Sequence, residues 1–138
     1  MIFIDALDLC SQKCEHWLVP QSEIVFYKEG ETVLFEEWLN TLPIKVQAKC
    51  LSLLRLLRSQ GHELRGPIAD FLRDGIYQLR PTYQGVHYRI LYFFSGRNVV
   101  IISHGFSKES QVPAVEINRA IERKRKYEAN PQAYGWKE

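Results

Sequence analysis

Hydrophobic residues recur at helical spacing in the first half of the chain. A short run rich in β-forming residues, positions 23–27, predicts a first strand, and the turn-forming sequence KEGET follows it. Apolar residues along one side of positions 32–40 predict a short helix. A second helix is predicted from Pro43 to about Gln60, because its apolar residues lie on one helical face and Gly61 can end it.

The second half alternates apolar and polar residues, which is typical of strands. Three strands are predicted over residues 75–83, 86–94 and 98–106, joined by turn sequences that contain glycine. The preceding residues 61–71 are interpreted as a connecting segment. Helices before and after such an antiparallel meander predict an α+β fold, with the helices packed on a small antiparallel sheet.

The length of 138 residues suits one domain with a modest core. Pro113 is predicted to open a last helix that runs to about Tyr127. The folded domain is therefore expected to span residues 23–130. Residues 1–22 form an N-terminal extension that could be helical, and residues 131–138 form a tail that is loose unless its two aromatic residues dock.

Side chains alternate between the two faces of a sheet, so the pattern also predicts which cations share a face. Gln78 and Arg80 share a side of the first strand, and Arg89 shares a side of the second with His87, Leu91 and Phe93. The third strand is expected to place Val100, Ile102, His104, Phe106 and Lys108 on one side. A sheet that presents Arg80, Arg89, His104 and Lys108 together would form a concave cationic surface lined by aromatic rings, which suits RNA.

These residue types also suggest a reaction. RNA carries its own nucleophile, the 2′-hydroxyl, so fixed arginine and lysine donors could stabilise the charge that develops on the phosphate. His104 could exchange a proton near neutral pH. Each residue also has an ordinary structural interpretation: Lys108 as a solvated loop charge, and His104 as a partly buried histidine with satisfied hydrogen bonds. The arginines Arg80 and Arg89 could be surface cations or could pair with Asp70, Asp74 or Glu63.

Composition and charge add three points. Residues 1–40 carry eight acidic residues and two lysines, whereas the remaining chain carries 16 basic and eight acidic residues, which favours a polyanionic or acidic partner. Three cysteines without framework spacing, no signal peptide and no membrane-spanning apolar run predict a cytoplasmic protein with no membrane association. Cys10, Cys14 and His16 lack a clear fourth zinc ligand, so neither a metal nor another cofactor is expected.

The second half of the chain carries four motifs in order, which read DGIYQLR, YRILYF, HGFSK and a proline that opens a helix. By these motifs the chain, from about Glu23 to Tyr127, resembles the phage-derived HigB-like branch of the RelE/ParE toxin superfamily. The resemblance implies a RelE-like microbial-RNase-type fold. It also implies the toxin of a type II toxin–antitoxin pair, a ribosome-dependent mRNA endonuclease (mRNA interferase) that cleaves by metal-free attack of the 2′-hydroxyl.

The resemblance assigns roles to particular residues. By resemblance, Arg80, Arg89, His104 and Lys108 would bind the scissile phosphate and act in proton transfer. Apart from the resemblance, RNA contacts are predicted for Arg73, Tyr83, His87, Arg97 and Phe106. The chain departs from the family pattern after HGFSK, because Glu109 stands where a second cation is common. The acidic extension before Glu23 is also outside the pattern, and one hypothesis makes it a lid over the basic sheet.

The implied partners are mRNA on the ribosome and a cognate antitoxin, a helix-turn-helix DNA-binding protein encoded adjacently. Operator DNA would be bound only through the toxin–antitoxin complex. Two alternatives stay open on the sequence alone: a ParE-like toxin that inhibits gyrase without cutting RNA, and a prophage remnant that keeps the fold and has lost activity. A titrating group among the cations separates the nuclease from a pure binder, which does not need one.

Overall fold

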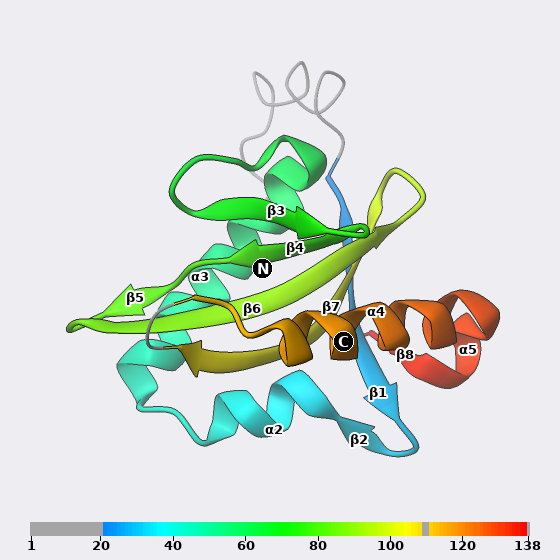
Figure 1. Ribbon diagram of the computed structural model, residues 1–138, viewed down its shortest axis with the longest axis horizontal. Coiled ribbons are helices and arrows are strands. Elements are labelled where there is room, and N and C mark those ends of the chain that lie inside the picture. Colours follow the sequence, from blue (N-terminus) through cyan, green and yellow to red (C-terminus); the bar gives the residue numbers. More distant parts are fainter. Residues whose placement is uncertain (1–20, 109–110, 138) are drawn as a thin grey trace, which may run out of the picture.

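The computed structural model describes residues 21–108 and 111–137, and Figure 1 shows the arrangement of their helices and strands. The helical elements are α2 (Leu34–Asn40), α3 (Ile44–Gln60), the 3₁₀ turn η1 (Gly61–Glu63), α4 (Ala114–Ala129) and α5 (Pro131–Tyr134). The strands are β1 (Glu23–Glu29), β2 (Thr32–Val33), β3 (Ala69–Arg73), β4 (Ile76–Leu79), β5 (Thr82–Tyr83), β6 (Val86–Ser95), β7 (Val99–Lys108) and β8 (Gly135–Trp136). None of these helices is long and apolar enough to cross a membrane.

The described strands form one mixed sheet in the order β2-β1-β7-β6-β4-β3, with β5 added to β6 and β8 to β1. The antiparallel β6–β7 hairpin is its centre, and the α+β fold class predicted from the sequence is confirmed. Two details differ from the prediction. Strand β1 pairs with β7 in parallel, and β3 forms within and beyond the segment that the sequence indicated as a connection.

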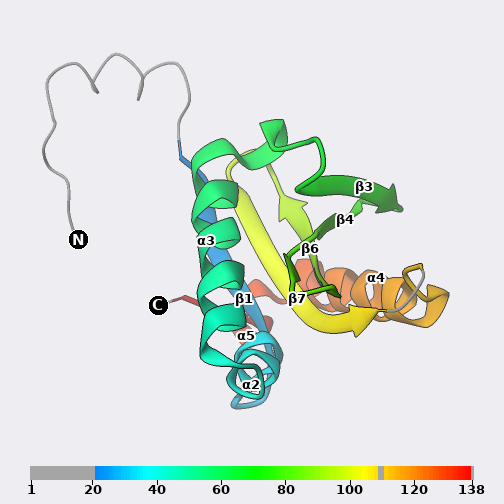
Figure 2. The same ribbon diagram turned by 90° about the vertical axis from the view of Figure 1, so that its left-hand side faces the viewer.

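Helices cover both faces of this sheet, as Figure 2 shows for α3 and α4. On one face, Tyr92 and Ile102 pack in a core cluster with residues of α2 and α3. On the other face, Phe93 and Ile101 pack with residues of α4. The run of buried residues along β6 therefore has a simple cause: neighbouring side chains point into two different cores.

The strand predicted over residues 75–83 is interrupted at Arg80 and Pro81. Proline has no backbone N–H and cannot donate to a ladder, so β4 ends at Leu79 and β5 begins at Thr82. The chain nevertheless stays beside β6, because the N–H of Tyr88 donates to the Pro81 carbonyl at 2.9 Å. The register before and after the break is continuous, which matters for the position of Arg80 below.

The tail was expected to be loose, and that expectation is wrong for residues 134–136, whose two aromatic side chains dock on β1. Trp136 of β8 pairs with Phe26 of β1, and the Tyr134 ring stacks on Tyr27 with centroids 5.6 Å apart. Stacked aromatic pairs of this kind add stability beyond their buried area. The folded unit of the described chain therefore extends through Trp136.

Candidate functional site

Two central strands place cationic and aromatic side chains on the face of the sheet that α4 covers. In the β6–β7 ladder, Arg89 lies opposite Phe106 and His87 lies opposite Lys108. Residues paired across a ladder point to the same face, so these four side chains share one surface. It is the surface that carries Leu91, which belongs to the α4-side core.

A bulge in β7 makes this arrangement possible. The β6–β7 register shifts between Leu91 and Tyr92, so that Leu91 pairs with His104 and Tyr92 pairs with Ile102. Ser103 is the extra residue of the bulge, and Ile102 consequently points to the α3 side while His104 points to the α4 side. The strict alternation predicted for this strand was therefore wrong on one point: Val100 and Ile102 do not share a face with His104. A bulge re-aims side chains in this way because it inserts one unpaired residue.

Arg80 joins the same surface through the β4–β6 register. Leu79 pairs with Ile90 before the Pro81 break and Thr82 pairs with His87 after it, which puts Arg80 opposite Arg89. Side chains directly opposite each other in a sheet have Cβ atoms about 5 Å apart. We call Arg80, Arg89 and Lys108 the cationic cluster. Burial lowers the pKa of Arg89 and of Lys108, and the members of the cluster are close enough that a neighbouring arginine charge lowers each of these pKa values further.

Arg89 is the buried member of the cationic cluster, with 5% of its surface exposed. Its Nη1 donates to the Tyr88 carbonyl at 2.7 Å, whereas Nε is buried and makes no hydrogen bond. Burial first, and then the Arg80 charge, lowers the pKa of Arg89. An arginine remains charged under these conditions, so the fold holds a desolvated cation that an anionic ligand would stabilise.

Acidic partners for the two arginines were an alternative in the sequence, and the described residues do not supply them. Asp74 binds Arg73, with an Nη1–Oδ2 distance of 2.8 Å, and an Asp70 carboxylate oxygen accepts the N–H of Phe71. Neither Arg80 nor Arg89 enters an ion pair within residues 21–108 and 111–137. The two arginines of the cluster therefore bring positive charge to the sheet that no acidic residue of the described chain pairs.

His104 shares the face but is engaged elsewhere. Its Nε2 lies 3.0 Å from Oε1 of Glu116 on α4, and its Nδ1 lies 2.8 Å from the Ser103 hydroxyl. The Glu116 carboxylate alone would favour the imidazolium, but burial, reinforced by the charges of Arg123 and Arg119, lowers the pKa of His104. A neutral ring fits both contacts, because Nε2–H donates to Glu116 and Nδ1 accepts from Ser103. This histidine joins β7 to α4 and has no ring nitrogen left for a substrate.

This geometry predicts a pH dependence of stability. Between about pH 6.5 and the folded pKa of His104, about 4, an unfolded histidine binds a proton that folded His104 does not, so the free energy of unfolding falls as pH falls, by up to about 1.4 kcal/mol per pH unit. We expect His104→Gln to flatten this slope in urea unfolding curves recorded between pH 7 and pH 5. The matched variant His87→Gln, at an exposed histidine, should keep the wild-type slope; equal slopes for both variants would contradict the assignment.

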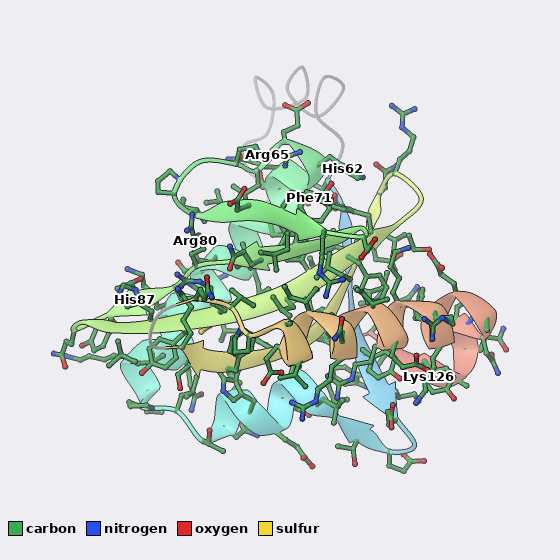
Figure 3. The ribbon with its side chains drawn as sticks, viewed as in Figure 1. His62, Arg65, Phe71, Arg80, His87 and Lys126 are labelled. Carbon is green, nitrogen blue, oxygen red and sulfur yellow. The ribbon has the colours of Figure 1, made fainter. Side chains whose placement is uncertain are left out.

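His87 is the histidine that lies among the cations. It pairs with Lys108 on one side and with Thr82 on the other, where Oγ1 and Nδ1 are 3.5 Å apart. The side chain is exposed, and Figure 3 shows it near Arg80 at the same end of the sheet. The sequence analysis gave His87 only an RNA contact; alternation along the strand could have singled it out as the histidine two positions from Arg89 on the same face.

Of the remaining residues predicted to contact RNA, some lie on the surface of the cationic cluster and others do not. Phe106 lies on the surface of the cationic cluster, and its ring centroid is 6.0 Å from that of His104. Tyr83 pairs with Val86 and packs against the α3-side core, on the opposite face. Arg73 binds Asp74 and Asn118, and Arg97 lies in the β6–β7 turn, eight positions along the chain from Arg89. Neither arginine belongs to the cationic cluster.

Gln78 is a residue that the site predictions omitted. It pairs with Leu91, so it lies on the α4-side face two positions from Arg80, and its side-chain Oε1 is buried without a hydrogen-bond partner. The alternation of the sequence already put Gln78 and Arg80 on one side. Only the tertiary structure adds that this amide is buried beside the cationic cluster.

Some predictions concern residues that the structure does not describe. Cys10, Cys14 and His16, the acidic extension and its hypothesis of a lid, and Glu109 all lie outside the described residues. Within the part of the chain that is described, no three histidine, cysteine, aspartate or glutamate side chains gather as a metal site.

Comparison with known proteins agrees with the sequence motifs at the level of the family. The model of one family, described as phage-derived protein Gp49-like (DUF891), matches residues 37–125, well over half of the chain. The match includes α3, the central strands and most of α4, and so contains every residue of the cationic cluster. A search of curated proteins found no match.

Proposed function

The chain belongs to the family of Gp49-like phage-derived proteins, and on this premise we propose that it is the toxin of a type II toxin–antitoxin system. The family is associated with RelE/HigB-type toxins. We propose that this chain has a RelE-like fold and acts as an mRNA interferase, which cuts mRNA on the ribosome. One observation carries the proposal: a buried arginine, Arg89, sits beside Arg80 and Lys108 without an acidic partner for either arginine among the described residues.

The cationic cluster suits a phosphate in a reaction that gains negative charge. Guanidinium groups bind phosphate oxygens through paired N–H donors, and Arg89 retains an unpartnered Nε–H for this purpose. Because the donors are fixed by the sheet, they need no reorganisation as charge develops on the phosphate. Phe106, opposite Arg89, supplies an aromatic surface next to the bound nucleotide.

In the proposed reaction the 2′-oxygen bonds to the adjacent phosphorus, and the bond from phosphorus to the 5′-oxygen of the next nucleotide breaks. The 2′-hydroxyl gives up a proton and the leaving 5′-oxygen gains one, which leaves a 2′,3′-cyclic phosphate and a 5′-hydroxyl. His87 is the imidazole that is exposed next to Lys108 and can exchange these protons. His104 is assigned a positioning role, because both of its ring nitrogens are already bonded.

The proposal includes the partners and compartment expected from the sequence. An acidic segment of a cognate antitoxin would neutralise the cationic cluster, and operator DNA would be bound through the antitoxin. The toxin would act on ribosomes in the cytoplasm. The second candidate, a ParE-like protein that inhibits gyrase without cutting RNA, is favoured by one observation, the loss of His104 as a free titrating group. His87, an exposed imidazole beside Lys108, keeps the nuclease as the first choice.

Induced expression in a bacterial host tests the proposal. We expect growth arrest together with new mRNA 5′ ends inside translated codons, because the 2′-hydroxyl is supplied by the message itself. Purified protein should cut an mRNA on programmed ribosomes, and a single 2′-deoxynucleotide at the cut position should block that cut. Arrest with intact mRNA would support the gyrase candidate instead, and folded protein without arrest would indicate an inactive remnant.

A further inference from the structure

A hollow of about 470 Å³ lies on the other side of the β5–β6 hairpin from the cationic cluster. Its lining residues come from the start of α3 and from the hairpin: Pro43, Ile44, Lys45, Val46, Tyr83, Gln84, Val86 and Tyr88. Two of its apolar side chains face solvent, with 76% of Ile44 and 43% of Val86 exposed. Exposed apolar residues that line one hollow indicate a surface that is covered by a ligand.

Only the β5–β6 hairpin separates the hollow from the cationic cluster. Tyr83 pairs with Val86, and these two side chains point to the hollow, whereas Thr82 pairs with His87, and these point to the cationic surface. The two faces alternate residue by residue along one pair of short strands. A single strand of RNA that crosses the β5–β6 hairpin would therefore have a phosphate on the cationic surface and a base within reach of the hollow.

Gln84, in the turn of this hairpin, has an unusual backbone. Its φ is 50° and that of Gly85 is 82°, as a two-residue hairpin turn requires. Asparagine, aspartate or glycine normally takes the first position, and the equivalent residue of the β3–β4 hairpin is Asp74. A glutamine held in this strained conformation, with its side chain lining the hollow, suggests a use for its longer amide.

We propose that the hollow binds one unstacked base of single-stranded RNA, next to the phosphate held by the cationic cluster. This inference rests on the proposed function and names the part of the RNA that the same site reads. The Tyr83 ring provides a stacking surface, the Gln84 amide offers a donor and an acceptor to a base edge, and the Lys45 ammonium suits a neighbouring phosphate. These polar groups among apolar walls, with a cationic surface on the other side of the hairpin, fit a base better than an aliphatic side chain of a protein.

Binding of RNA with one missing base tests this inference. The probe is a fluorescein-labelled eight-nucleotide RNA, compared with eight versions that each carry one abasic nucleotide, by fluorescence anisotropy at fixed salt. We expect one abasic position to weaken wild-type binding by roughly 5- to 150-fold, the range for a base stacked on an aromatic ring. The Tyr83→Leu variant should bind the intact RNA as weakly as the wild type binds the RNA that is abasic at that position. Removing that base should then weaken binding by the variant no further. Phe71→Leu, at a half-exposed aromatic on the edge strand β3, should behave like the wild type.

Gln84→Asn gives a second variant that is not expected to impair folding. Asparagine tolerates positive φ better than glutamine does, so the melting temperature of the variant should equal or exceed that of the wild type. Its discrimination among bases at the sensitive position should fall. A flat abasic profile, a Tyr83→Leu profile like that of the wild type, or no binding of the RNA would each overturn the inference. A hollow that instead accepts an apolar side chain of a partner protein would give the flat profile. Loss of mRNA cutting on ribosomes in an Arg89 variant tests the proposed function separately.

Discussion

Arg89→Met is expected to lower the rate of mRNA cleavage by at least about a hundredfold, as loss of one fixed donor to a developing anion does. The side chain lies at the centre of the cationic cluster, between Arg80 and Phe106, and methionine keeps most of its length without the charge. The measurement is the single-turnover rate on programmed ribosomes, together with growth after induction. Arg89→Lys should recover only part of the rate, because lysine lacks the planar pair of donors.

The same variant separates a binding role from a structural one. Removing a buried cation that has no acidic partner should leave the free energy of unfolding unchanged or raise it, so activity should fall without loss of stability. The matched control is Arg97→Met, at an exposed arginine in the β6–β7 turn, which should keep wild-type cleavage. If Arg89→Met cut mRNA at the wild-type rate, the assignment of the phosphate site would be wrong.

Gly105→Val is expected to lower the free energy of unfolding by about 1–3 kcal/mol, the usual effect of overfilling a packed site. A Cβ atom at Gly105 would overlap the ring of Trp38, which packs against Phe35 and Tyr88. The glycine of the HGFSK motif is thus explained by close packing of α2 on β7. Valine otherwise favours strands, so a loss of stability here would reflect the contact with Trp38 and not strand propensity.

Urea unfolding of four variants checks this explanation. Ser107→Val, at an exposed position two residues along the same face of β7, should be neutral or slightly stabilising. Trp38→Leu should reduce the effect of Gly105→Val when the two are combined, because residues in contact are not additive. Equal losses for Gly105→Val in the presence and absence of Trp38 would show that the ring is not the cause.

Local sequence patterns were sufficient to predict a helix or strand where its hydrophobic residues follow one clear period. The helix α3 was predicted from the helical spacing of its apolar residues, and the β6–β7 hairpin from alternation and a glycine turn. The β3 strand was missed because its residues follow Gly66 and Pro67 and include the half-exposed Phe71, so no alternation of buried and exposed positions marks it. Strand pairing is also absent from such patterns, and the parallel β1–β7 pair could not be read from them.

The candidate site was likewise predicted only in part from the sequence. Alternation and motif order are properties of neighbouring residues, so they were enough to predict that Arg80, Arg89 and Lys108 lie in strands or at their ends. Which of these residues meet depends on the folded chain: the bulge at Ser103 turns His104 toward Glu116, and the register across the Pro81 break puts Arg80 opposite Arg89. Burial, ion pairing and pKa depend on groups far apart in the chain, so the local sequence does not contain them.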